Sequence, residues 1–399
     1  MKHNTLAKCL ALCGLLLGLA GLFAPRTLAA VPTSSAAAAS PASSAASSAI
    51  LKEQTEKSGA SDLYRQTPSA ARKLLEKLGI RELSRESLAK FTPAALFGTA
   101  FQKLKTAAQA PLKVAAAICG ILLCCALLQT MKNSVGEKPL QNVFQLVCTL
   151  SVAAVLLTPV SQCVTLVSQA IGQSSDFILT CLPVFVGLTA SSGHPASAAI
   201  GQGMLLIVSQ VFSRISATTF VPMVHIFLAF CIVASISPGV RILPIATFAR
   251  KAVEWGLGIC MTIFIGILTV QSLISQAADS VTMKAAKFVV GSAVPVVGGT
   301  ITDAINTVVG CASLLKTTVG AYAIVVLILA FLPPLLDCVL WTLTAEISVA
   351  VAEFLGITDI SELLKAVAQA LKLLNALLLT AALTLIISLT VLLTFSSGS

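Results

Sequence analysis

The stretch Gly266–Lys316 reads GILTVQSLISQAADSVTMKAAKFVVGSAVPVVGGTITDAINTVVGCASLLK. It begins as an apolar membrane segment, turns polar over 271–279 and then becomes apolar again with several interruptions. A continuous membrane helix needs only about 20 apolar residues. Broken backbone at membrane depth is tolerated where it packs against protein or lines a watered cavity. We therefore predict an interrupted polar segment over 266–318, with these candidate hinge or close-packing positions: Gly291, Pro295, Gly298 and Gly299.

The composition around this stretch is that of an integral membrane protein. The chain is 56% hydrophobic and 11% charged, against a norm near 25% charged residues in soluble domains. Its formal charge of +10 does not indicate nucleic-acid binding, because the basic residues of 51–113 alternate with acidic ones, as on a solvated helix face. Ten of the twelve cysteines lie in or beside apolar segments and are interpreted as packing residues.

The N-terminal part of the chain divides into three regions. Residues 1–30 resemble a secretory signal peptide, with an apolar core and small residues near Ala29 at the cleavage site; an uncleaved first span is the alternative. Residues 31–60 are an Ala/Ser-rich flexible tether. Residues 61–113 contain helix starts at Thr67-Pro68 and Thr92-Pro93 and form either a small external helical domain or amphipathic helices on the membrane surface.

Residues 114–395 form a polytopic membrane domain. The fold class is therefore all-α, with eight transmembrane helices preferred and ten as the alternative. The two ambiguous segments are 288–314, which we expect to be re-entrant, and 338–356. An extracytoplasmic N-terminus places the Lys and Arg residues of the first and fifth loops inside, as the positive-inside rule requires, and leaves 168–176 as an external loop. The remaining spans are predicted near 114–130, 141–167, 177–192, 198–213, 220–237, 255–277, 319–334 and 373–395.

A polar stripe follows the interruption at helical spacing. Its members recur at steps of three and four residues and so share one helix face: Asp303, Asn306, Gly310, Ser313 and Thr317. An Asp at the centre of a membrane helix costs roughly 2.5–3.5 kcal/mol on insertion scales. The stripe is therefore a candidate pathway-lining or assembly face, and the alternative is an amphipathic helix on the membrane surface.

Signatures of catalysis are missing from the sequence. It contains no His-Glu-x-x-His motif, no phosphate-binding loop and no nucleophile elbow. We predict that the protein is not an enzyme and has no catalytic, cofactor-binding or metal-binding residues and no cofactor. Glu346 and Glu353, seven residues apart, share a helix face and are interpreted as a solvated edge in preference to a site.

The segment 266–320 resembles the stage III sporulation protein AE family of endospore-forming bacteria. The resemblance depends on TMKAAK at 282–287, VPVVG at 294–298 and Asp303, in that order, and similarity in layout extends from about residue 67 to 395. The family implies a membrane component of the channel complex between mother cell and forespore, needed for forespore development after engulfment.

The resemblance also implies partners and a location. The partners would be other membrane proteins of the channel complex, including a secretion-type ATPase and ring-forming subunits. Apart from the resemblance, we expect contact with the lipid bilayer and allow for a homo-oligomer. The location would be the mother-cell-derived membrane around the forespore, with the mature N-terminus outside the cytoplasm. Two alternatives stay open: a stand-alone secondary transporter, and a membrane scaffold that conducts nothing.

Overall fold

The computed structural model of this 399-residue chain describes residues 63–79, 93–135, 138–192, 195–236, 243–293 and 298–394. All regular elements in these ranges are helices. Six of the helical stretches are long and apolar enough to cross a membrane. The predicted all-helical class is therefore confirmed for these residues, and the six stretches agree with a membrane protein by length and composition. The predicted signal peptide and tether lie outside the described residues.

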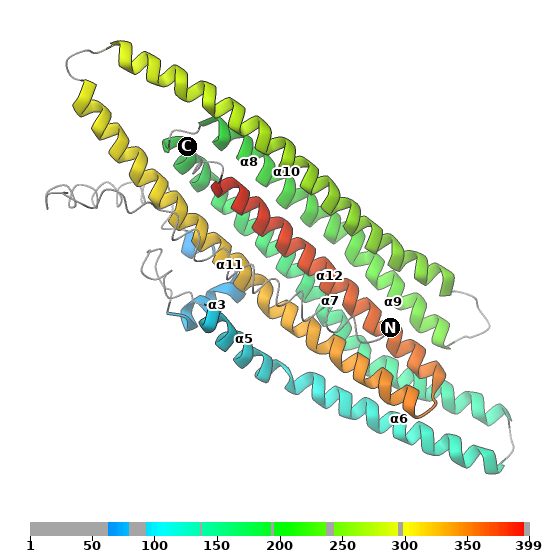
Figure 1. Cartoon of the computed structure of the whole chain (residues 1–399). Coiled ribbons are helices and arrows are strands. Elements are labelled where there is room, and N and C mark those ends of the chain that lie inside the picture. The colour runs from blue at the N-terminus through cyan, green and yellow to red at the C-terminus, as the bar shows by residue number, and fades with distance from the viewer. Residues whose placement is uncertain are drawn as a thin grey trace.

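The long helices pack side by side and alternate in direction, giving an elongated bundle (Figure 1). In chain order the elements are α3 (Ser69–Lys77), α5 (Pro93–Ala107), α6 (Gln109–Val135), α7 (Lys138–Ser191), α8 (Pro195–Ile215), the π-helical segment η2 (Ser216–Phe220), α9 (Val221–Ile236), α10 (Leu243–Ala293), α11 (Gly298–Phe354) and α12 (Thr358–Thr394).

Three of these helices are much longer than a bilayer is thick. Helices α7, α10 and α11 contain 54, 51 and 57 residues. At about 1.5 Å per residue, α7 alone extends about 80 Å, whereas the hydrocarbon core of a bilayer is about 30 Å thick. Each of these helices therefore has room for one crossing and a long extension beyond it.

The predicted external loop at 168–176 is wrong, because these residues lie within α7. The polar side chains that suggested a loop are instead packed against the next helix. Ser174 and Ser175 are buried, and the Ser175 hydroxyl donates to the backbone carbonyl of Ser209 in α8 at 2.9 Å. A short polar side chain can make its hydrogen bond while it lies in the middle of a helix. The polarity of these residues therefore did not mark the end of a helix.

Other predicted spans also merge into longer helices. The segments 198–213 and 220–237 form one nearly continuous helical run through η2, and 319–334 and 338–356 both lie in α11, which continues through Pro333 and Pro334. The 288–314 segment is divided between the end of α10 and the start of α11. The described residues thus give six candidate crossings, and the predicted count of eight or ten is not confirmed.

The helical hairpin α11–α12 forms the centre of the bundle. Helix α11 contacts α12, α7, α6, α5 and α3, and the largest apolar cluster is built around these two helices. A side chain at Gly320 would collide with Leu393 of α12, so glycine is what allows this close approach.

A short turn joins the two central helices. Gly356 has φ +71°, its N–H bonds to the carbonyl of Glu353 at 3.1 Å, and the N–H of Ile357 bonds to the carbonyl of Ala352 at 3.0 Å. This is a Schellman ending, in which a left-handed glycine satisfies the last carbonyls of a helix. The turn aligns α11 and α12 as antiparallel neighbours.

Candidate functional site

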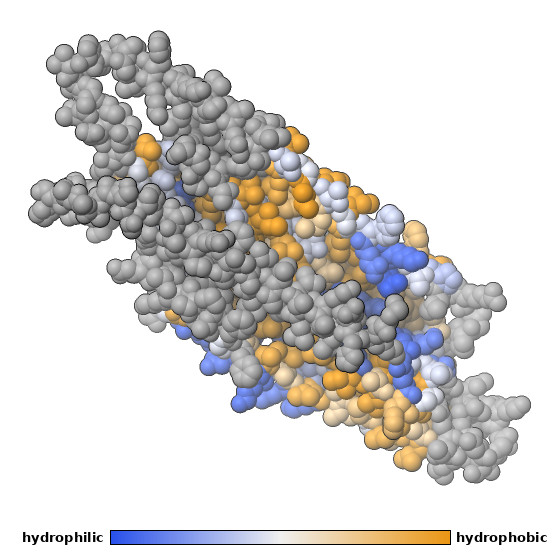
Figure 2. Space-filling view, viewed as in Figure 1, coloured by the Kyte–Doolittle hydropathy of each residue, from blue (hydrophilic) through white to orange (hydrophobic). Residues whose placement is uncertain are grey.

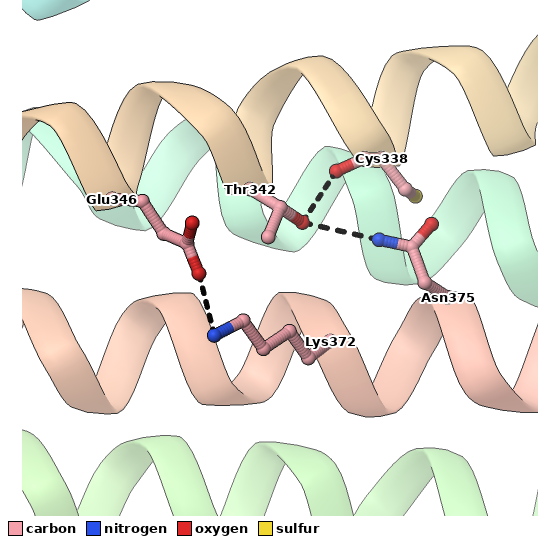
Figure 3. Close-up of polar contacts among 5 residues, drawn as sticks. All are labelled: Cys338, Thr342, Glu346, Lys372 and Asn375. Atoms are coloured by element: carbon pink, nitrogen blue, oxygen red, sulfur yellow. Dashed lines mark hydrogen bonds and ion pairs between the residues drawn. The ribbon is translucent and has the colours of Figure 1, made fainter. Parts of the chain in front are cut away.

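A row of polar side chains crosses the interface between α11 and α12 near their connecting turn. The Glu353 carboxylate pairs with the Lys365 ammonium at 2.9 Å, and the Glu346 carboxylate pairs with the Lys372 ammonium at 2.5 Å (Figure 3). Both the acidic and the basic residues are seven apart, so the antiparallel helices present them as two rungs about 10 Å apart. We call this row, together with Thr342 and Asn375, the polar seam.

The seam continues into the interior of the bundle as a hydrogen-bonded chain. The Asn375 amide donates to the Thr342 hydroxyl at 3.1 Å, and that hydroxyl donates to the backbone carbonyl of Cys338 at 2.7 Å (Figure 3). Asn375 is 2% exposed, and its side-chain oxygen has no hydrogen-bond partner among the residues that the structure describes. An unpartnered buried amide oxygen costs about 1–3 kcal/mol, so this end of the seam favours a donor such as water.

The ion pairs of the seam are only partly covered by protein. The side chains of Glu346 and Lys372 are 29% and 30% exposed, and those of Glu353 and Lys365 are 34% and 43% exposed. In water, such pairs stabilise a protein by about 0–1 kcal/mol. The two ion pairs therefore contribute little to the stability of the fold. Their partial exposure instead indicates that a polar environment contacts them.

A second polar contact joins the segment around α3 to helix α11. The Thr67 and Tyr322 hydroxyls lie 2.8 Å apart, and the Thr67 hydroxyl also donates to the carbonyl of Leu63 at 3.0 Å. Tyr322, in α11, is fully buried, as are Ala71 and Leu75 of α3. The part of the predicted external region that α3 represents is therefore docked on α11.

A buried lysine in α11 was missed by the sequence analysis. Lys316 is 2% exposed and lies within a long apolar stretch, Val309–Phe354. Lysine is almost never fully buried unless it is paired. The signal that the sequence offered was a lysine inside a strongly apolar run. Lys316 also adds a polar group to the same helix that carries the polar seam.

The predicted polar stripe lies on the N-terminal half of α11. The side chains of Asp303 and Asn306 are outside the described residues. Gly310 is exposed, Ser313 and Thr317 are half-buried, and the Thr317 hydroxyl donates to the carbonyl of Ser313 at 2.9 Å. The pathway-lining or assembly role of the stripe stays a prediction.

The predicted hinge positions surround the break between two long helices. Gly291 is in the last turn of α10, and Gly298 and Gly299 begin α11, whereas Pro295 lies outside the described residues. The end of one helix and the start of the next thus coincide with the predicted interruption, and the hinge role itself is untested.

The interpretation of all the membrane cysteines as packing residues is wrong for one pair. Cys125 of α6 and Cys148 of α7 form a disulfide, with Cα atoms 6.6 Å apart. Neighbouring antiparallel helices bring together residues that are 23 positions apart in sequence, which no local spacing rule would identify.

In the described part of the chain, no three His, Cys, Asp or Glu side chains are placed to hold a metal ion.

Comparison with known proteins identifies the family. The family model described as stage III sporulation protein AE matches residues 79–396. Stage III sporulation protein AE of Bacillus subtilis (strain 168) is 25% identical over 270 residues, which cover 68% of each chain. No solved structure matches. Because the family match covers most of the chain and includes α5 to α12, this protein belongs to the stage III sporulation protein AE family.

Proposed function

We propose that this protein is a membrane component of the channel complex between mother cell and forespore, required for forespore development after engulfment. Family membership supports a role in sporulation. The observation that favours a channel component is the polar seam. Its half-exposed ion pairs lie on a central helix of an apolar bundle, where water or another protein would have to contact them.

The bundle also supports an orientation in the membrane. The C-terminal ends of α6, α9 and α11 lie toward the same end of the bundle as the N-terminal ends of α7, α10 and α12 (Figure 1). Basic residues gather at these ends in the sequence: Lys132, Lys138, Arg241, Arg250, Lys251, Lys365 and Lys372. By the positive-inside rule this end would be cytoplasmic, which would leave the C-terminal end of α10 and the N-terminal end of α11 on the extracytoplasmic side.

In the proposed setting the cytoplasm is that of the mother cell, and the N-terminal region occupies the space between the two membranes. The partners would be other membrane proteins of the complex, including a secretion-type ATPase and ring-forming subunits. The predicted stripe from Asp303 to Thr317 would lie toward the intermembrane side, where it would line a pathway or join subunits. The proposed role is non-enzymatic.

Deletion of the gene in the sporulating host tests this function. We expect engulfment to finish and forespore development to stop afterwards, with recovery when the full-length chain is supplied again. The measurement is the yield of heat-resistant spores together with microscopy of engulfed forespores. Normal spore yield in the deletion strain would overturn the proposal.

A further inference from the structure

The junction between α5 and α6 joins a basic stretch to the start of an apolar helix. Helical hydrogen bonding continues through it: the Ala108 N–H donates to the Leu104 carbonyl at 2.9 Å, and the Leu112 N–H donates to the Ala108 carbonyl at 3.1 Å. Lys105, Leu112 and Leu123 are all exposed, and their spacings of 7 and 11 residues are close to two and three whole helical turns. One outward face therefore carries a lysine in α5 and leucines in α6.

Charged residues frame the part of α6 that can lie in hydrocarbon. The 18 residues of Val114–Met131 contain no charge and are bounded by Lys113 and Lys132. At about 1.5 Å per residue this run extends about 27 Å, close to the hydrocarbon thickness of a bilayer, about 30 Å. Leu123, within the run, is 54% exposed, as expected of a side chain that faces lipid. Lys113 is thereby placed at one boundary of the hydrocarbon, with Lys105 about 12 Å beyond it along the helix axis.

The α5 side of this boundary is basic and has no acid of its own. Residues 93–135 contain neither Asp nor Glu, and Lys103, Lys105 and Lys113 are all exposed. Lys103 interacts electrostatically with the Asp337 carboxylate of α11, whereas Lys105 and Lys113 form no ion pair in the part of the chain that the structure describes. Along the lower edge of Figure 2, hydrophilic surface where α5 lies gives way to mostly apolar surface where α6 follows.

From this placement we infer that the α5–α6 junction binds the headgroups of anionic phospholipids. The Lys105 and Lys113 ammonium groups contact the lipid phosphate, and Leu112, which is 64% exposed, contacts the acyl chains. Lysine suits this position because its stem lies along apolar surface while its ammonium stays in the polar layer.

A lipid matches the junction better than other anions do. A free phosphate ion or an acidic protein segment would supply the countercharge for the lysines but no apolar partner for the exposed leucine beside them. A zwitterionic lipid would supply the acyl chains but carries its own cation. A singly charged phosphodiester lipid supplies both the countercharge and the acyl chains. The inference does not depend on the proposed channel role.

Quenching of a tryptophan at the junction tests this directly. In the full-length protein, Trp255→Phe and Trp341→Phe remove both native tryptophans, and Gln109→Trp places one at an exposed position between Lys105 and Lys113. The protein is reconstituted in mixed bilayers of phosphatidylglycerol and phosphatidylcholine, with brominated acyl chains on one lipid at a time. We expect phosphatidylglycerol to be preferred at the junction by about fivefold or more, since each lysine near an anionic surface contributes about that factor.

Double variants separate these lysines from the general surface charge. Lys105→Gln with Lys113→Gln should lower the preference about fivefold or more, whereas Lys105→Arg with Lys113→Arg should keep it. The matched control is Lys73→Gln with Lys77→Gln, which removes the same charge from exposed positions of α3 and should leave the preference unchanged.

The control helix lies farther from the apolar part of α6. Thr67, just before α3, meets Tyr322 of α11, whereas Ala100 of α5 packs with Leu332. The ten residues between these two positions on α11 extend about 15 Å, in the direction in which α5 leads into α6 (Figure 1). This separation exceeds the Debye length of about 8 Å at physiological ionic strength.

Several outcomes would overturn the inference. Equal quenching by the two lipids would show no headgroup selection, and weak quenching by both would place the junction away from the bilayer surface. An equal loss of preference in the α3 control would assign the effect to general charge. A preference abolished by inorganic phosphate at constant ionic strength would assign the lysines to a free anion. Spore yield enters none of these readouts, so the proposed function stands or fails separately.

Discussion

Helices α11 and α10 are both long and apolar, yet protein covers them to very different extents. In the most apolar window of α11, 78% of the residues are buried within the bundle, against 17% in α10. Exposed large side chains such as Phe248, Trp255 and Ile263 follow one another along α10. Apolar composition therefore has two meanings in this chain: in α11 it fills a protein core, and in α10 it faces the surroundings of the bundle.

The largest contrast is expected from truncating an aromatic residue in each helix. Phe331 of α11 is 1% exposed and Trp255 of α10 is 73% exposed. Phe331→Ala should lower the free energy of unfolding by about 3–5 kcal/mol through lost contacts and a cavity, and Trp255→Ala should change it by about 0.5 kcal/mol or less. Helical circular dichroism during unfolding in detergent measures both, and equal effects would remove the distinction between the helices.

Adding volume at a glycine should give the next largest difference. Gly320→Leu places a side chain against Leu393, whereas Gly258→Leu in α10 meets nothing within 4 Å. Overpacking costs about 1–3 kcal/mol, so the α11 variant should unfold at a lower temperature and the α10 variant should not. The check is the midpoint of thermal unfolding of the full-length protein; an unchanged midpoint for Gly320→Leu would show that α12 shifts freely.

A smaller effect is expected where α3 docks on α11. Tyr322→Phe removes the hydroxyl that meets Thr67 and should weaken the contact by about 0.5–1.5 kcal/mol. Limited proteolysis should then cleave more quickly within residues 63–79. Thr318→Val is the control, since its hydroxyl bonds within its own helix to the Leu314 carbonyl at 2.9 Å; faster cleavage in that variant too would point to a general loosening of α11.

The smallest contrast concerns two ion pairs. A double-mutant cycle with Glu346→Gln and Lys372→Met should give a coupling of up to about 1 kcal/mol for these partly covered charges. The pair of Glu254 and Arg250 within α10, at 3.6 Å and more exposed at its glutamate, should give about 0.3–0.5 kcal/mol, as neighbours four apart on a helix do. A coupling that is larger in α10 would contradict this order.

Sequence patterns were sufficient for the fold class and the family, because both depend on local features. Long apolar runs predict membrane helices, and the motifs near Lys284 and Asp303 indicated the family that the full comparison then showed. Helix boundaries were predicted less well. Short polar residues such as Ser175 were interpreted as a loop, although the Ser175 side chain bonds to the neighbouring helix, and such packing is not visible in local polarity.

The polar seam could be predicted from the sequence only in part. The seven-residue spacing of Glu346 and Glu353 correctly predicted a shared face. Lys365 and Lys372 have the same spacing after Gly356, so a hairpin at that glycine would have suggested the pairing. Asn375 gave no such signal, since its unpartnered oxygen depends on contacts between two helices.

The three-residue connection at 355–357 also sets how a change of length would act on this hairpin. One inserted residue within the first turns of α12 would rotate every later residue by about 100° and advance it by about 1.5 Å. Because both rungs and the Thr342–Asn375 contact share one register, such a shift would break all three together. The length of the 355–357 connection thus fixes the register between α11 and α12. A change in that length would disturb contacts far along both helices.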